Sequence, residues 1–163
     1  MPLYLHLSIH FCAAVISGYI VGRYFRRPGL GVIAGILGGF LIDLDHVLEY
    51  FLVFGPQFNL WMFFNGRQFL VSDQIRLFFH AWEYAIIFLA LAAILYRRKK
   101  AVAFLLAFVF AGLVHLASDC LINNYPPRNY SFIYRANRNF KAVELLSPAQ
   151  YHEYLTDRRK VGL

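Results

Sequence analysis

Charged residues and cysteine are both scarce in this chain. Lys, Arg, Asp and Glu together make up 15% of the 163 residues, and apolar residues make up 60%, against roughly 45–50% in a soluble globular domain. The apolar residues lie in long runs, which is typical of an integral membrane protein. The two cysteines, Cys12 and Cys120, lie in such runs, where an unpaired cysteine is most often a small core residue. No disulfide can therefore be inferred from the sequence, and the redox compartment stays open.

The charged residues that are present are unbalanced, with a net charge of +7. A basic balance can indicate nucleic-acid binding, but no basic face and no RNA- or DNA-binding motif accompanies it here. Lys and Arg instead stand in short clusters beside the apolar runs, which is the pattern of membrane topology signals. The charge therefore predicts a membrane protein with no nucleic-acid partner.

Four apolar runs come near the ~20 residues that a helix needs to cross a bilayer. The first has no Lys or Arg before Arg23, so it lacks the charged region of a secretory signal peptide and is expected to be a retained helix. The second contains Gly31, Gly35 and Gly39, a spacing that lets a neighbouring helix approach closely. We expect an all-α fold, a four-transmembrane-helix bundle, with spans at 3–22, 29–54, 77–96 and 101–122.

Basic residues gather in the first and third connections, at 23–27 and 97–100. Short basic connections normally face the cytoplasm, so both termini and the 55–76 connection are expected on the periplasmic or extracytoplasmic side of an inner membrane. The tail is also basic, which opposes this orientation, but long segments follow the rule less strictly. The short connections therefore decide the predicted orientation.

The tail, residues 126–163, differs in character from the expected membrane domain, residues 1–125. Pro126 and Pro127 end the fourth run, because proline removes a backbone donor and restricts the residue before it. Further on, Ser147-Pro148-Ala149-Gln150 has the pattern of a capped helix start. The sequence predicts a short interfacial helix from Pro148 to about residue 159.

Three tail arginines lie among aromatic and Asn residues. They would suit a phosphate-bearing headgroup at the mouth of a site, or they form only a solvated charged face. Both interpretations stay open for Arg128, Arg135 and Arg138.

Ionisable side chains stand within the apolar runs themselves. The second run contains Asp43, Asp45 and His46. An ionised carboxylate out of water costs several kcal/mol unless it is paired, protonated or bound to a metal, so such residues indicate a functional site. The other runs supply partners at helical spacing: His6 and His10 in the first, His80 and Glu83 in the third, and His115 and Asp119 in the fourth.

The depth of these residues is the stronger indication. Successive helices run in opposite directions, so randomly placed histidines would scatter to both membrane faces. At about 1.5 Å per residue, His10, His46, His80 and His115 all lie roughly 5–12 Å from the side of the termini. Imidazole nitrogen and carboxylate oxygen are ligands that zinc prefers. The sequence therefore predicts one or two divalent metal ions, with Zn²⁺ the expected metal, held by His6, His10, Asp43, His46, His80, His115 and Asp119.

The arrangement resembles the YdjM-like family of LexA-regulated inner-membrane proteins, which are metal-dependent hydrolases. The family pattern has an N-terminal His, an Asp-x-Asp-His ending the second helix, a His-Arg-x-x-Thr-His entering the third and a His-x-x-x-Asp closing the fourth. The matching residues, all before residue 125, are His6 or His10, Asp43, Asp45, His46, Arg76, His80, His115 and Asp119. Ile75 and Phe79 stand where the family has a His and the Thr. Glu83 could replace the missing ligand or hydrogen-bond a ligand histidine.

The resemblance implies a membrane-embedded metal-dependent hydrolase, in which the cation activates a water and polarises the scissile bond. Asp45 or Glu83 is then the expected general base, and Arg76 or Arg128 would neutralise developing charge. A site this close to the headgroups favours a small amphiphilic substrate, such as a membrane lipid with an ester or amide bond.

Two other classes stay open at this point. A di-iron oxygenase or desaturase also uses His and carboxylates on four helices, although such enzymes usually need more than the six histidines present here. A metal or proton transporter, or a non-enzymatic membrane partner protein, is the other class. Transport predicts polar residues through the full depth of the bundle, whereas the expected cytoplasmic halves contain almost none.

Overall fold

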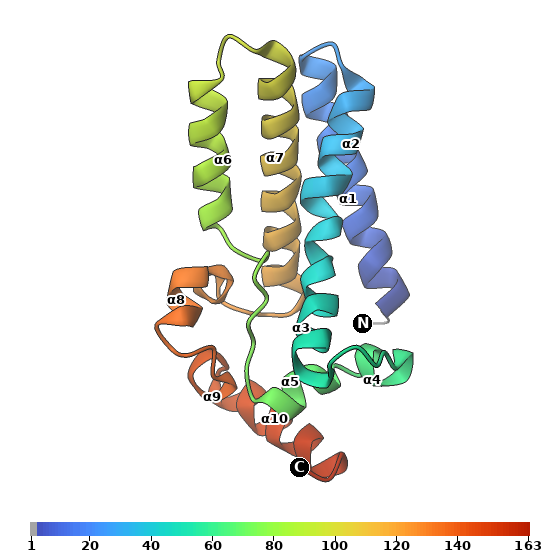
Figure 1. The fold of residues 1–163 in the computed structure, drawn as a ribbon, viewed down its shortest axis with the longest axis vertical. Helices are drawn as coiled ribbons and strands as arrows, with labels where there is room; N and C mark the ends of the chain where they lie inside the picture. Colours follow the sequence, from blue (N-terminus) through green and yellow to red (C-terminus); the bar gives the residue numbers. More distant parts are fainter. Residues whose placement is uncertain (1–2) are drawn as a thin grey trace.

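The computed structural model describes residues 3–163, and over those residues the chain is helical with no strand (Figure 1). The all-α class is therefore confirmed. The elements are α1 (Leu3–Tyr24), α2 (Pro28–Gly39), the 3₁₀ turn η1 (Leu41–Asp43), α3 (Leu44–Phe54), α4 (Leu60–Phe64), α5 (Arg67–Ser72), α6 (Glu83–Ile94), α7 (Lys99–Ile122), the 3₁₀ turn η2 (Pro127–Tyr130), α8 (Phe132–Ala136), α9 (Ala142–Leu145) and α10 (Pro148–Lys160).

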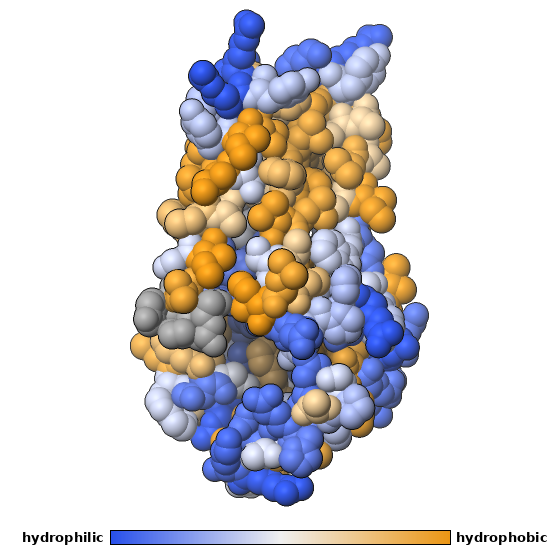
Figure 2. All heavy atoms as spheres, turned by 180° about the vertical axis from the view of Figure 1, so that it is seen from behind, coloured by the Kyte–Doolittle hydropathy of each residue, from blue (hydrophilic) through white to orange (hydrophobic). Residues whose placement is uncertain are grey.

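Three helical stretches of the described chain are long and apolar enough to cross a membrane: Leu5–Tyr24, Pro28–Phe54 and Lys99–Ile122. The second stretch consists of α2, η1 and α3, and α1, α2 and α7 pack against one another. Apolar side chains form a broad band between two more polar ends on the face in Figure 2. This distribution is that of a membrane protein, because hydrocarbon tolerates apolar side chains and excludes charged ones.

The third expected span, 77–96, is shorter than predicted. Its helix α6 has 12 residues, which corresponds to about 18 Å against a hydrocarbon core of about 30 Å. Four full-length spans are therefore not confirmed, and His80 precedes the helix instead of opening it.

In the segment before α6, side chains from other elements hydrogen-bond to the backbone N–H and C=O groups. These bonds explain why the first turns of the expected span are not helical. The N–H groups of Phe79 and His80 donate to the Asp45 carboxylate at 2.9 and 3.3 Å. The Arg135 guanidinium donates to the carbonyls of Leu77 and His80 at 2.7 and 2.9 Å. Because these polar groups have partners outside a helix, the irregular segment persists at the end of the bundle.

Glycines bring the long helices into close contact, as their spacing predicted. A Cβ at Gly31 would collide with the carbonyl oxygen of Gly18 on α1, and one at Gly35 would collide with that of Ala14. Gly39 packs in the same way against Ala111 of α7. Small residues thus set the distance between the helices that carry the histidines.

The tail packs across the end of the bundle where both termini lie (Figure 1). Backbone bonds from Ile75 to Phe140 and from Ala142 to Asp73 pair it with the irregular segment before α6. Its last helix, α10, begins with the expected capping box of Ser147 and Gln150. The tail and the segment before α6 thus form one layer beneath the long helices.

Gly31→Ala tests the close approach of α1 and α2. The added methyl would meet backbone, which cannot move as a flexible side chain would, and we expect a loss of about 1–3 kcal/mol in stability. Gly29→Ala is the matched control, because nothing lies within 4 Å of a Cβ there. Thermal unfolding in detergent should show a lower midpoint for Gly31→Ala alone; equal midpoints would contradict this packing.

Candidate metal centre

Seven His and Asp side chains from α1, η1, α3, the segment before α6, and α7 gather at one end of the bundle. They fall into three overlapping groups whose ligand atoms lie within 4.8 Å of one another, and any of these groups could hold a metal ion. His80 and Asp119 each belong to two groups, so the cluster is continuous. Its members are His6, His10, Asp43, His46, His80, His115 and Asp119, the same seven residues that the sequence suggested as ligands.

The centre of the cluster has the spacing of ligands around one ion. The Nε2 atoms of His80 and His115 lie 3.1 Å apart, and each lies 3.3 Å from Oδ2 of Asp119. Oδ1 of Asp43 is 3.4 Å from the first nitrogen and 3.5 Å from the second. Ligands about 2.0–2.1 Å from a tetrahedral zinc are about 3.3 Å apart. These five separations are close to those between ligands of one small divalent cation.

The tautomers of these two histidines can be inferred from their other nitrogens. Nδ1 of His115 lies 2.7 Å from the carbonyl oxygen of Gly39, and Nδ1 of His80 lies 2.9 Å from Oδ2 of Asp45. Both oxygens only accept, so each Nδ1 carries a proton, and each ring, when neutral, directs a lone pair from Nε2 into the cluster. Two lone pairs and two carboxylate oxygens then face one point with no donor between them. A cation satisfies this arrangement, and the bonds at Nδ1 are those that typically orient a metal-binding histidine.

A break in the second long helix supplies one of those oxygens. After α2 the backbone tightens into η1, where Asp43 N–H bonds to Phe40 at 3.4 Å instead of reaching Gly39. The Gly39 carbonyl is thereby free for His115. The sequence did not reveal this oxygen, although the paired Gly38 and Gly39 mark the place where the helix is weakest.

A second group of ligand atoms lies on the α1 side of the cluster. Nε2 of His6 and of His10 are 3.0 Å apart, and they lie 3.7 and 3.2 Å from Oδ1 of Asp119. Asp119 thus offers one oxygen to this pair and the other to His80 and His115. His46 stands at the opposite edge, with Nε2 3.8 Å from Oδ1 of Asp43. The carboxylate of Asp119 is placed to bridge two ligand sets.

Asp45, expected as a general base, has a different position. It is fully buried, and Oδ2 accepts from two backbone N–H groups as well as from His80 Nδ1. Its carboxylate lies on the far side of the His80 ring from the cluster, because a helical residue two positions from Asp43 projects in another direction. Asp45 orients His80 and does not belong to any of the ligand groups.

Glu83 and Arg76 also differ from their expected places. Glu83 accepts from the Ser131 hydroxyl and from the N–H groups of Phe132 and Ile133, so it holds the start of α8. Arg76 donates to Glu49 at 3.0 Å and to Gln74. The helical spacing of His80 and Glu83 is lost because α6 starts only at Glu83. Glu49, which is fully buried one turn after Asp45, was missed in the sequence.

The three tail arginines do not form one anion site. Arg135 is 1% exposed and donates to three backbone carbonyls, which makes it a tether between the tail and the segment before α6. Arg138 lies 3.7 Å and Arg128 5.7 Å from the ring centre of Tyr134. Only Arg135 lines the cavity beside the cluster, and its donors face carbonyls.

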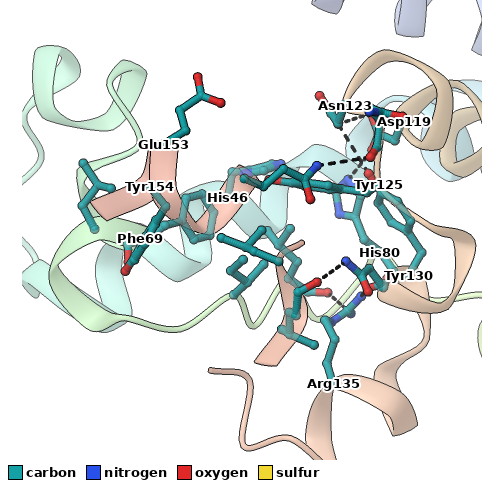
Figure 3. A pocket seen from close by; sticks show the side chains of 18 of the residues that line it. His46, Phe69, His80, Asp119, Asn123, Tyr125, Tyr130, Arg135, Glu153 and Tyr154 are labelled. Carbon is teal, nitrogen blue, oxygen red and sulfur yellow. Dashed lines mark hydrogen bonds and ion pairs between the residues drawn. The ribbon is translucent and has the colours of Figure 1, made fainter. Parts of the chain in front are cut away.

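A cavity of about 610 Å³ opens between the cluster and the tail. His46, His80 and Asp119 of the cluster line it; in Figure 3, Tyr130 lies beside His80 and Asp119, and Glu153 and Tyr154 lie at the other end. Burial, and then Asp119, raise the pKa of the Tyr130 phenol, so this hydroxyl stays protonated. The cavity, which the sequence could not delimit, gives a ligand space beside the cluster that is lined by both polar and apolar side chains.

Comparison of the chain with protein-family models, with curated proteins and with solved structures finds no match. The resemblance to the YdjM-like hydrolases therefore remains a prediction that rests on the short motifs alone.

Removal of one central ligand tests the metal centre. We expect His115→Ala to contain no metal above the buffer level, because it takes one nitrogen from the centre of the cluster. Asp45→Asn should keep the ligands but lower affinity about 10–100-fold, since a supporting hydrogen bond is weakened. His152→Ala, on the exposed face of α10, should match the unaltered protein. Mass spectrometry of metals in purified protein is the measurement; full occupancy of His115→Ala would exclude this centre.

Proposed function

We propose that the protein is a membrane-embedded metal-dependent hydrolase that acts on an amphiphilic substrate such as a membrane lipid. The observation that carries the proposal is the cluster of inward-facing lone pairs and carboxylate oxygens beside a polar cavity. A bound divalent cation there would lower the pKa of a water and polarise a carbonyl or phosphoryl oxygen. The side chains around the cluster, at the end of the bundle, are exposed and partly apolar. Such surroundings suit a substrate that remains in the bilayer.

We propose Zn²⁺ in two positions that share Asp119. His80, His115 and Asp43 would complete one position, and His6 and His10 the other. Neutral imidazole and carboxylate ligands without sulfur agree with zinc, and the three ligands of the second position would leave a place for water or substrate. Two ions held side by side would polarise the scissile bond and activate a water, as in two-metal phosphatases and nucleases.

The remaining polar groups have separable roles in this proposal. Asp45 and the Gly39 carbonyl hold the rings of His80 and His115. Oδ2 of Asp43 has no hydrogen-bond partner within residues 3–163, and we propose it as the proton acceptor in place of Asp45 and Glu83. Tyr130, which lines the cavity, would donate its hydroxyl proton to a polar atom of the substrate.

Transport is less well supported by the distribution of buried polar side chains. Within the described chain, Ser17 is the one buried polar residue of α1 outside the cluster. In α2, and in the half of α7 farther from the cluster, the buried residues are Ala, Gly, Val and Leu. A path for ions would need polar partners along its length.

Isotope labelling tests the reaction class. Metal-loaded protein in mixed micelles of detergent and bacterial polar lipids should release a lipid product that carries one ¹⁸O from H₂¹⁸O, with or without O₂. His152→Ala should behave alike, and His115→Ala should match the protein-free control. A product labelled from ¹⁸O₂ would indicate an oxygenase instead, and no product from the loaded protein would contradict the proposal for these lipids.

We propose that the cluster faces the periplasmic or extracytoplasmic side of an inner membrane, since the loops 25–27 and 95–98 at the opposite end carry clustered basic residues. In a background without Cys12 and Cys120, a cysteine at Lys99 should escape a membrane-impermeant maleimide in intact cells. A cysteine at Asn137, exposed at the end of α8, should be labelled. The reverse pattern would place the cluster on the cytoplasmic side.

A further inference from the structure

A second cavity, of about 370 Å³, also reaches the metal cluster. Its wall includes His6, Asp43 and His46, which belong to the cluster, and it shares His6, His46 and Phe69 with the polar cavity. The two cavities therefore meet at the ligands. A molecule that occupied both would pass directly by the cluster.

Apart from Gln68, the side chains in the rest of this second cavity are apolar. Its lining includes Leu7, Phe40, Leu44, Val47, Phe63 and Phe64. These side chains come from α1, the break after α2, α3 and α4. Amides, acids and tyrosines line the first cavity together with apolar residues such as Leu70, Ile75 and Leu145, so it is the more polar of the two. The pair of cavities thus has the polarity of an amphiphile.

The rim of the apolar cavity is open to the surroundings of the bundle. Leu44 is 51% and Phe64 57% exposed, and α3 belongs to a stretch able to span a membrane. On α4, Leu60 and Trp61 are exposed as well. Exposed apolar side chains beside a membrane span are expected to lie in lipid. A hydrocarbon chain could therefore enter sideways from the bilayer without crossing water.

We propose that the apolar cavity binds one hydrocarbon chain of the substrate while its headgroup occupies the polar cavity, which places the bond between them at the cluster. This inference rests on the proposed function for its reaction, but chain binding itself requires no turnover. An apolar cavity of ~150 Å³ holds benzene, so about 370 Å³ corresponds to a chain on the order of a dozen carbons.

The probe is a dodecylphosphocholine analogue with a diazirine at the chain end, photolysed with the protein in dimyristoylphosphatidylcholine nanodiscs. Mass spectrometry locates the adducts. We expect them on cavity residues such as Leu7, Val47 and Phe63, with competition by unlabelled dodecylphosphocholine. Val47→Trp fills the cavity and should reduce these adducts at least about fivefold, because each excluded methylene is worth about fourfold in binding.

Leu48→Trp is the matched control, since it adds the same indole one residue away on the exposed face of α3. It should leave the adducts unchanged, and both variants should retain their metal. Adducts spread over lipid-facing residues such as Ile86 and Ile94, without competition, would overturn the proposal. Adduct mapping on the unaltered protein decides the question even where Val47→Trp does not fold. If the protein hydrolyses lipid but the cavity is not labelled, only the chain-binding site is refuted. If the cavity is labelled but no lipid is hydrolysed, only the proposed reaction is refuted.

Discussion

The facing lone pairs of His80 and His115 are the constraint on which the rest of the structure depends. Each ring is fixed by an acceptor at Nδ1, so the two Nε2 atoms, 3.1 Å apart, cannot hydrogen-bond to each other in their neutral forms. Carboxylate oxygens of Asp43 and Asp119 add negative charge at the same point. Without a cation, and with both rings neutral, the lone pairs and carboxylates would repel one another in a site where His80, His115 and Asp119 are buried.

Irregular backbone around the cluster follows from this requirement. The break between α2 and α3 frees the Gly39 carbonyl for His115, and the segment before α6 lets two N–H groups and a histidine converge on Asp45. Both departures from regular helix would be costly in lipid. They are tolerated here because side chains take up the backbone groups, with Arg135 satisfying carbonyls that α6 leaves free.

Much of the candidate centre was predictable because helical spacing and depth are local properties of the sequence. His6 and His10 share a helix face whatever surrounds them, and so do His115 and Asp119. The spacing of Gly31 and Gly35 likewise predicts that another helix packs closely there. The roles of Asp45, Glu83 and Arg76 were not predictable. Each depends on a segment whose conformation is set by contacts distant in sequence, such as Arg135 with Leu77 and Glu83 with Ser131. The shortness of α6 has the same origin.

The central claim is that these side chains bind one metal centre together. X-ray absorption at the edge of the metal that copurifies with the protein tests it most directly. We expect a shell of nitrogen and oxygen ligands at about 2.0–2.1 Å, with the outer-shell scattering of at least two imidazole rings, and the loss of that scattering in His115→Ala. A shell of oxygen alone, or a spectrum that His115→Ala leaves unchanged, would contradict the account.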